Sequence, residues 1–250
     1  VGTEAGKGGT TSAPYSSGIY NTAIGYEALK RFTSGQDNTA LGKGALAYLT
    51  TGGSNIGIGY QAGGNTTTAN GNIYIGRSTG NNNNSGIENV CVGEYNYAHD
   101  PGIVNFRNVT TLGSNAGRFA TGSYNTFLGS YAGQGTNTSA PFNSGEKNTV
   151  IGFEALKVFT TADNNTILGY RAGYSTTTGN NNVYLGYQAG FRGTTALENI
   201  AIGPNSQQGV SGQTTGRYNV SLGVNSLFGL TTGNHNFVVG SNAGYSLTGG

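Results

Sequence analysis

Asn21-Thr22-Ala23-Ile24-Gly25-Tyr26-Glu27-Ala28-Leu29 contains the pattern from which nearly the whole chain is built. Its skeleton, Asn-x-x-aliphatic-Gly-x-x-small, returns along the sequence, and eight of the thirteen intervals between its glycines are 17 residues long. We call these the corner glycines: Gly2, Gly25, Gly42, Gly59, Gly76, Gly93, Gly113, Gly129, Gly152, Gly169, Gly186, Gly203, Gly223 and Gly240. A fixed period of this kind predicts a solenoid, with one strand and one corner in each coil.

Each position of the motif has its own residue type. The residue before each corner glycine is Val, Ile or Leu, and the residue two before that is Thr, Val, Ile or Phe, as in Thr22 and Ile24. Alternate residues of a strand share a face, so we expect these two to point into the coil. Asn stands four residues before the corner in twelve coils. At a strand spacing of about 4.8 Å, its amide can bond to its copies above and below.

Composition excludes several classes of protein. Gly makes up 46 of 250 residues and charged residues only 9%, yet the invariant aliphatic position argues against a disordered tract. A net charge of +2 without a Lys or Arg run predicts no nucleic-acid partner. No apolar stretch approaches the roughly 20 residues of a membrane helix. The single cysteine, Cys91, cannot form an internal disulfide and is expected to be a small buried residue.

The coils are themselves grouped into a longer sequence repeat. Residues 11–33 and 138–160 agree at sixteen of twenty-three positions, an offset of 127 residues. This predicts two seven-coil units, 1–127 and 128–250, continuous with each other as one solenoid of about fourteen coils. Both ends of the chain fall inside the repeat, so we expect it to be a segment of a longer protein or of an end-to-end assembly.

Candidate catalytic groups lack partners within the chain. Glu27 and Glu154 occupy the same motif position but are seven coils apart, on the order of 34 Å at strand spacing. Glu88 and Glu94 flank one strand at roughly 20 Å. His99 and His235 have no second ligand at metal-binding spacing. The sequence therefore predicts no catalytic residue, no metal and no cofactor.

Aromatic residues follow several corners directly. Tyr26, Tyr60, Phe153, Tyr170 and Tyr187 occupy this position, and Gln61 and Gln188 come next to two of them. Such a row could stack sugar rings beside amide hydrogen bonds. The preferred interpretation is a stacking spine that stiffens the solenoid.

The middle residue of each strand is often apolar as well, which predicts an oligomer. No segment has a sustained helical period that could cover this face, and strands covered on both faces lose the polar alternation. We expect a second copy of the chain to cover it. The interface residues predicted on this ground are Ala23, Ala40, Val150, Ile167, Ala201 and Val238.

The motif, with its relatives at 148–156 and 165–173, resembles the head repeat of trimeric autotransporter adhesins and similar repeats in phage tail fibres. The resemblance covers nearly the whole chain, although the coils here are mostly 17 residues, longer than the adhesin repeat. It implies a left-handed parallel β-roll, three chains around one axis, intertwined or side by side, and attachment to a surface as the function.

We therefore expect a non-enzymatic, structural and adhesive fibre segment, extracellular, on a virion fibre or a bacterial surface. Its expected partners are copies of itself and a glycan or protein receptor on a host or cell surface. The alternative is a glycan-depolymerising, tailspike-like enzyme. A self-assembling extracellular filament subunit and an ice-binding protein rank lower. The ice-binding hypothesis ranks last because the regularly placed threonines, such as Thr22 and Thr149, share the expected inward face.

Overall fold

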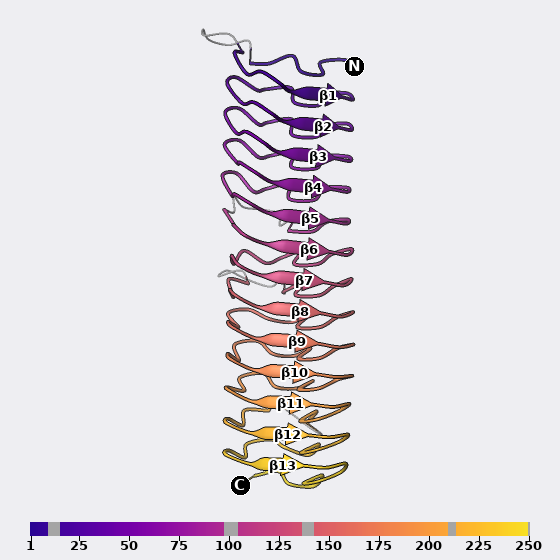
Figure 1. Cartoon of the computed structure of the whole chain (residues 1–250), viewed down its shortest axis with the longest axis vertical. Helices are drawn as coiled ribbons and strands as arrows, with labels where there is room; N and C mark the ends of the chain where they lie inside the picture. Colours follow the sequence, from indigo (N-terminus) through magenta and orange to yellow (C-terminus); the bar gives the residue numbers. More distant parts are fainter. Residues whose placement is uncertain (10–15, 98–104, 137–142, 210–213, 250) are drawn as a thin grey trace. The chain divides into compact units, whose positions relative to one another are not determined.

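The computed structural model describes residues 1–9, 16–97, 105–136, 143–209 and 214–249. Within these residues the chain is an all-β parallel solenoid with thirteen strands and no helix (Figure 1). The predicted fold class is confirmed. The chain divides into two compact units, Val1–Tyr124 and Asn125–Gly250, which are described separately below.

Every strand is three residues long and belongs to one coil. The strands of the first unit are β1 (Thr22–Ile24), β2 (Thr39–Leu41), β3 (Ile56–Ile58), β4 (Ile73–Ile75), β5 (Val90–Val92) and β6 (Thr110–Leu112). Those of the second are β7 (Thr126–Leu128), β8 (Thr149–Ile151), β9 (Thr166–Leu168), β10 (Val183–Leu185), β11 (Ile200–Ile202), β12 (Val220–Leu222) and β13 (Phe237–Val239). Within each unit, neighbouring strands pair in parallel with equivalent motif positions opposite each other, for example Thr22 with Thr39.

The corner glycines explain why the motif tolerates no side chain there. All fourteen have φ between 125° and 140°, a region that L side chains rarely adopt. A Cβ added to Gly42 would also lie 2.6 Å from the carbonyl oxygen of Gly59 in the next coil. The positive φ therefore favours glycine at every corner, and close stacking of the coils adds to this at corners such as Gly42.

The motif asparagines form the predicted ladder. Asn55 Nδ2 donates to Asn38 Oδ1 at 3.0 Å and to the carbonyl of Ala69 at 2.8 Å. Asn72 repeats the arrangement by donating to Asn55 Oδ1 at 2.9 Å. All three side chains are buried, so the ladder satisfies polar groups that water does not reach. Val109 holds this position in one coil, where only its backbone N–H donates to Asn89 Oδ1, at 3.0 Å.

The predicted orientation of the strand faces is wrong. The middle residues fill the interior of their own chain: Ala40, Val150 and Ala201 are fully buried and Ile167 is 1% exposed. Ala23 and Val238 also point inward, and they are half-buried because they lie in β1 and β13. None of these six residues is available to a neighbouring chain through that face. The outward residues are the flanking ones, including Ile24 at 45% and Leu168 at 46% exposed.

The reason for the inversion is how a narrow coil is filled. In most coils one of two interior positions is large and the other small: the middle strand residue and the fourth residue after the corner. Gly57 and Gly63 are both small, and Leu46 and Tyr74 of the neighbouring coils pack against Gly63. Tyr184 is paired with Gly190, where an added Cβ would approach Tyr184 Cε2 to 2.5 Å. Ala40 is paired with the larger Leu46, and both are buried. Variation at the middle position is thus a sign of interior packing, where side chains of the same coil and of its neighbours together fill the space.

Candidate functional site

The aromatic residues after the corners of the second unit form a stack. The rings of Phe153 and Tyr170 lie 5.8 Å apart and 9° from parallel, and those of Tyr170 and Tyr187 lie 5.3 Å apart and 7° from parallel. Their exposed fractions are between 40% and 50%. Because each ring faces the next, the faces between them are occupied, and the stacking spine expected as one alternative is present here. Gln188 lies beside it and accepts a hydrogen bond from Gln208 at 2.5 Å.

At the position directly after the corner, the first unit has a different arrangement, in which cations alternate with rings. Cations also lie over rings in the second unit, where the Arg171 guanidinium is 5.3 Å from the Tyr170 ring centroid. Lys43 Nζ lies 5.7 Å from the ring centroid of Tyr26 and 5.8 Å from that of Tyr60. The Arg77 guanidinium lies 6.0 Å from Tyr60 and 5.4 Å from Tyr95.

Arg118 continues the series, 5.2 Å from Tyr95 and 4.9 Å from Phe119. The sequence analysis found Tyr26 and Tyr60 but missed the cations, although Lys43 and Arg77 occupy the same motif position as the two tyrosines. We call the series the cation–aromatic ladder: Tyr26, Lys43, Tyr60, Arg77, Tyr95, Arg118 and Phe119.

A polar groove of about 270 Å³ borders the far part of this ladder. Amide and hydroxyl side chains line it together with Tyr95 and Arg118: Gln61, Asn65, Ser78, Asn81 and Asn82. Asn65 Nδ2 donates to Asn82 Oδ1 at 2.8 Å, which orders one wall of the groove. Donors, acceptors and a cation therefore converge in one shallow site.

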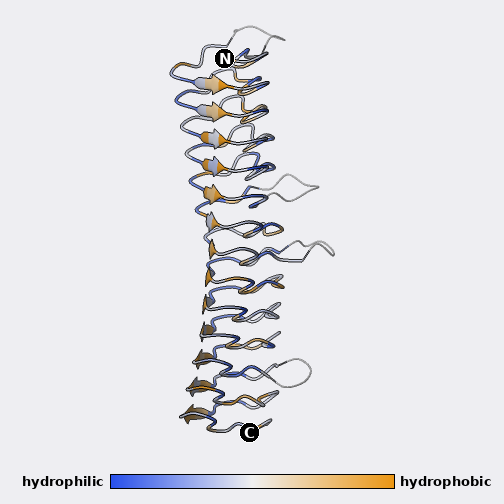
Figure 2. Ribbon diagram, turned by 90° about the vertical axis from the view of Figure 1, so that its right-hand side faces the viewer, coloured by the Kyte–Doolittle hydropathy of each residue, from blue (hydrophilic) through white to orange (hydrophobic). Residues whose placement is uncertain are grey.

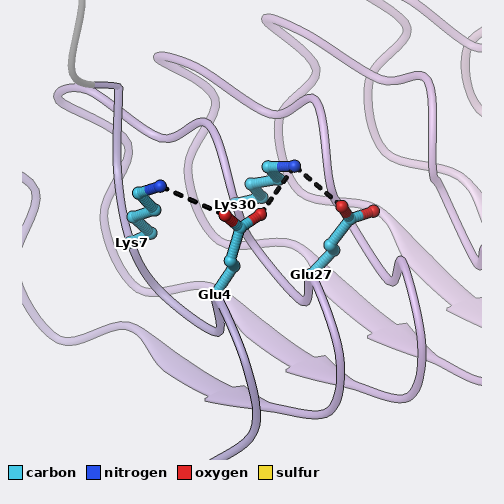
Figure 3. Close-up of polar contacts among 4 residues, drawn as sticks. All are labelled: Glu4, Lys7, Glu27 and Lys30. Carbon is cyan, nitrogen blue, oxygen red and sulfur yellow. Dashed lines mark hydrogen bonds and ion pairs between the residues drawn. The ribbon is translucent and has the colours of Figure 1, made fainter.

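Two carboxylates lie close together at the start of the chain, a pair not predicted from the sequence although Glu4 and Glu27 both stand two residues after a corner glycine. Lys30 Nζ contacts Glu4 Oε2 and Glu27 Oε1, both at 2.7 Å, and Lys7 contacts Glu4 at 3.1 Å (Figure 3). The hydrogen bond from Lys30 lowers the pKa of both carboxyl groups, with Lys7 adding to the effect on Glu4. Both groups are therefore ionised near neutral pH.

Glu154, at the motif position of Glu27, is held in the same way in the second unit. Burial alone would raise its pKa, but hydrogen bonds from Lys157 and Arg171, both at 2.6 Å, outweigh burial and lower it. A glycosidase acid needs a carboxyl group whose pKa is raised. In Glu4, Glu27 and Glu154 the pKa moves in the opposite direction.

The outward residues of the strands form a largely apolar surface along each unit. Orange in Figure 2 marks the strands as hydrophobic segments of the chain. We define the outer strand face as the first and third residues of every strand. Its most exposed aliphatic members are Ile24, Leu41, Val90 and Leu112 in the first unit and Leu168, Ile200, Ile202 and Val239 in the second. None of the described strand residues is charged.

Other candidate chemistry is unsupported in the described residues. No group of three or more His, Cys, Asp and Glu side chains is placed to hold a metal ion there. His235 stacks on Tyr218 with centroids 4.9 Å apart, and His99 lies outside the described residues. Cys91 is buried as predicted, and burial raises the pKa of its thiol to about 12. Among the described residues there is no helix of the length and apolarity that a membrane span requires.

Comparisons with family models, with curated proteins and with solved structures found no match to this chain.

Proposed function

We propose that the chain is a structural and adhesive fibre segment that assembles with copies of itself and attaches to a surface. The observation that carries this proposal is the outer strand face, an uncharged row of aliphatic and threonine side chains that repeats in every coil of each unit. Exposed apolar surfaces of this extent are typical of protein interaction sites.

A second copy of the chain is the partner that fits this face. Each coil adds one pair of outward side chains to the row, at a spacing of about 4.8 Å. A second surface with the same spacing can pack against it in every coil. A standard interface takes about 800 Å² from each partner. Two partly exposed side chains per coil over the six strands of the first unit or the seven of the second provide an area of this order.

The number of copies follows from the resemblance to adhesin heads, which implies three chains around one axis. Cyclic symmetry is compatible with a face that meets its own copies along the fibre. The same resemblance supports an extracellular location in this proposal, on a virion fibre or a bacterial surface. Its receptor would be a cell-surface glycan or protein.

A non-enzymatic role is proposed over a glycan-depolymerising one. Glu4, Glu27 and Glu154 are neutralised by cations, and their lowered pKa values leave them without a proton to donate near neutral pH. Incubation with capsule or envelope polysaccharide should release no reducing ends. Release that disappears in Glu27→Gln or Glu154→Gln would establish the enzyme instead.

Sedimentation velocity tests self-assembly directly. We expect the wild-type chain to sediment as an oligomer, and Leu41→Asp with Leu168→Asp to sediment as a folded 25.5 kDa monomer, because two carboxylates would be buried in the interface. The matched control is Thr161→Asp, an exposed residue outside the strands. A monomeric wild type, or an oligomer that survives the two substitutions, contradicts the proposal.

Ice binding becomes a second candidate because the threonines expected to point inward lie on the outer strand face. Thr22, Thr149 and Thr166 are exposed on the outer strand face, as an ice-binding array requires. The threonine rows end after a few coils, since Ile56 and Val183 take over the position. We therefore rank it below self-assembly, and strong thermal hysteresis of the monomeric variant would reverse the order.

A further inference from the structure

We propose that the cation–aromatic ladder of the first unit binds a linear acidic polysaccharide with one anionic group per disaccharide. This rests on the adhesive function proposed above and names the chemistry of its receptor. The argument combines three features of one surface: the spacing of its cations, their immobilisation between rings, and the amide groove beside them.

The spacing of the cations follows the coil. Lys43 and Arg77 belong to corners that are two coils apart, and so do Arg77 and Arg118. Two coils correspond to about 9.6 Å along the axis, which is about the length of an extended disaccharide unit. Lys43 and Arg77, at the same motif position, therefore lie at about the interval at which such a polymer presents its carboxylate or sulfate groups. Arg118 lies two coils further on, at a different motif position beside Tyr95.

The rings hold the cations at that interval. Lys43 lies between the rings of Tyr26 and Tyr60, and Arg77 between those of Tyr60 and Tyr95, all at 5.4–6.0 Å. Cations fixed over aromatic faces lose less side-chain entropy when a ligand binds. Lys43 and Arg77 are nevertheless exposed to solvent, so they remain accessible to an anion.

The local charge is positive and only partly balanced. The single carboxylate bonded to a ladder cation in the described structure is Glu94, whose Oε1 lies 3.5 Å from Arg77 Nη1 at an exposed site. Arg118 instead donates to the amide oxygen of Asn115 at 3.1 Å. The ladder therefore offers more positive charge than it neutralises, and exposed charges of this kind attract anionic ligands at low salt.

The adjoining groove provides hydrogen-bonding groups for the uncharged part of the glycan. Gln61, Asn65 and Asn81 line it next to Tyr95 and Arg118. Amides both donate and accept hydrogen bonds, which matches the hydroxyl groups of a sugar between two anionic positions. The occupied ring faces favour this ligand over a nucleic acid, because bases need free aromatic faces on which to stack.

Calorimetric titration with hyaluronan oligosaccharides, which carry one carboxylate per disaccharide, tests the proposal. Affinity should rise up to the hexasaccharide, whose three carboxylates match the three cations, and change little with further length. Each of Lys43→Gln, Arg77→Gln and Arg118→Gln should weaken binding about three- to tenfold, and the triple variant should abolish it. Arg217→Gln, which removes an exposed cation from the second unit, is the matched control and should bind as the wild type does.

Neutral dextran and oligothymidylate are the competing probes. Equal binding of dextran, or undiminished hyaluronan binding by the triple variant, would overturn the acidic-glycan inference and leave the adhesive function standing. Tighter binding of oligothymidylate would replace it with nucleic-acid binding. Absence of binding to hyaluronan would overturn the inference as well. Sedimentation of the same samples reports assembly independently, so failure of the fibre proposal is seen separately.

Discussion

The two faces of each strand differ in how much their residues vary. A uniform row of aliphatic residues is usually interpreted as the core, but here the uniform position is exposed. On the inner face the middle residue ranges from Gly57 to Tyr74, and all the fully buried large rings of the strands lie here. On the outer strand face the residue before the corner is always Val, Ile or Leu. The uniform position before the corner is thus on the exposed face, and the most variable strand position is in the core.

The physical reason is that the two faces are constrained differently. Interior residues must together fill a fixed space, whereas residues of an interface must present a matching surface. Inside the solenoid, a large residue is acceptable wherever the residues that face it, in its own coil or the next, are small, so residue types vary while the interior stays filled. If the outer strand face meets copies of itself, as proposed above, similar shapes are needed in successive coils, which would explain why the residue before the corner is always Val, Ile or Leu. Substitutions on the inner face should therefore impair folding, and those on the outer strand face should impair the proposed assembly.

The largest difference is expected between neighbours in β9. Ile167→Asp places an unpaired carboxylate in the core, where it should cost more than about 4 kcal/mol and unfold the surrounding coils. Leu168→Asp points outward and should leave the fold intact while weakening assembly. Far-ultraviolet circular dichroism with sedimentation separates the two outcomes. Equal loss of structure in both variants would show that the faces are not distinct.

Reciprocal packing predicts a rescue inside one coil. Tyr184→Ala should lower the free energy of unfolding by about 3–5 kcal/mol, because it leaves a cavity. Adding Gly190→Leu should restore about 1–3 kcal/mol, since Leu46 already occupies the equivalent position with φ of 48°. Denaturant titration of the single and double variants measures this. Gly190→Leu alone should destabilise, and the absence of any rescue would contradict reciprocal filling.

The asparagine ladder should give a smaller effect. Asn182→Ala removes the bond from Asn182 Nδ2 to the Ala196 carbonyl, 2.8 Å, and the acceptor for the Asn199 N–H, 3.0 Å. Both partners are buried, so the expected cost is about 1–3 kcal/mol. Thr178→Ala, an exposed neighbour, should change stability little under the same denaturant titration. A neutral Asn182→Ala would mean that water replaces the ladder.

The smallest effect is expected from the ion pairs on the surface. The pKa of Glu154 is lowered from 4.5, so its stabilising contribution is present above that pH and is lost as the pH falls through the lowered value. Because Arg171 is partly exposed, we expect less than about 1 kcal/mol. Stability measured from about pH 6 to about pH 3 should fall less in Glu154→Gln than in the wild type. Parallel curves would show that other carboxyl groups dominate.

Much of the candidate site could be located from the sequence, but not its arrangement. The positions of Tyr26 and Tyr170 after their corners are evident from the motif. Whether a ring meets another ring or a cation depends on the next coil, and Arg118 reaches Tyr95 from a different motif position. Glu4 and Glu27 are likewise joined only because Lys30 can contact both.

The sequence by itself determined the parallel solenoid, the corner glycines and the asparagine ladder. Each is a backbone requirement repeated at a fixed period, such as the positive φ of Gly25 or the amide bond between Asn38 and Asn55. Only the tertiary structure decided which strand face is the core. Alternation separates two faces without saying which one the chain encloses. That choice depends on volumes contributed by residues such as Leu46 and Gly190, which meet the strand only after the coil has closed.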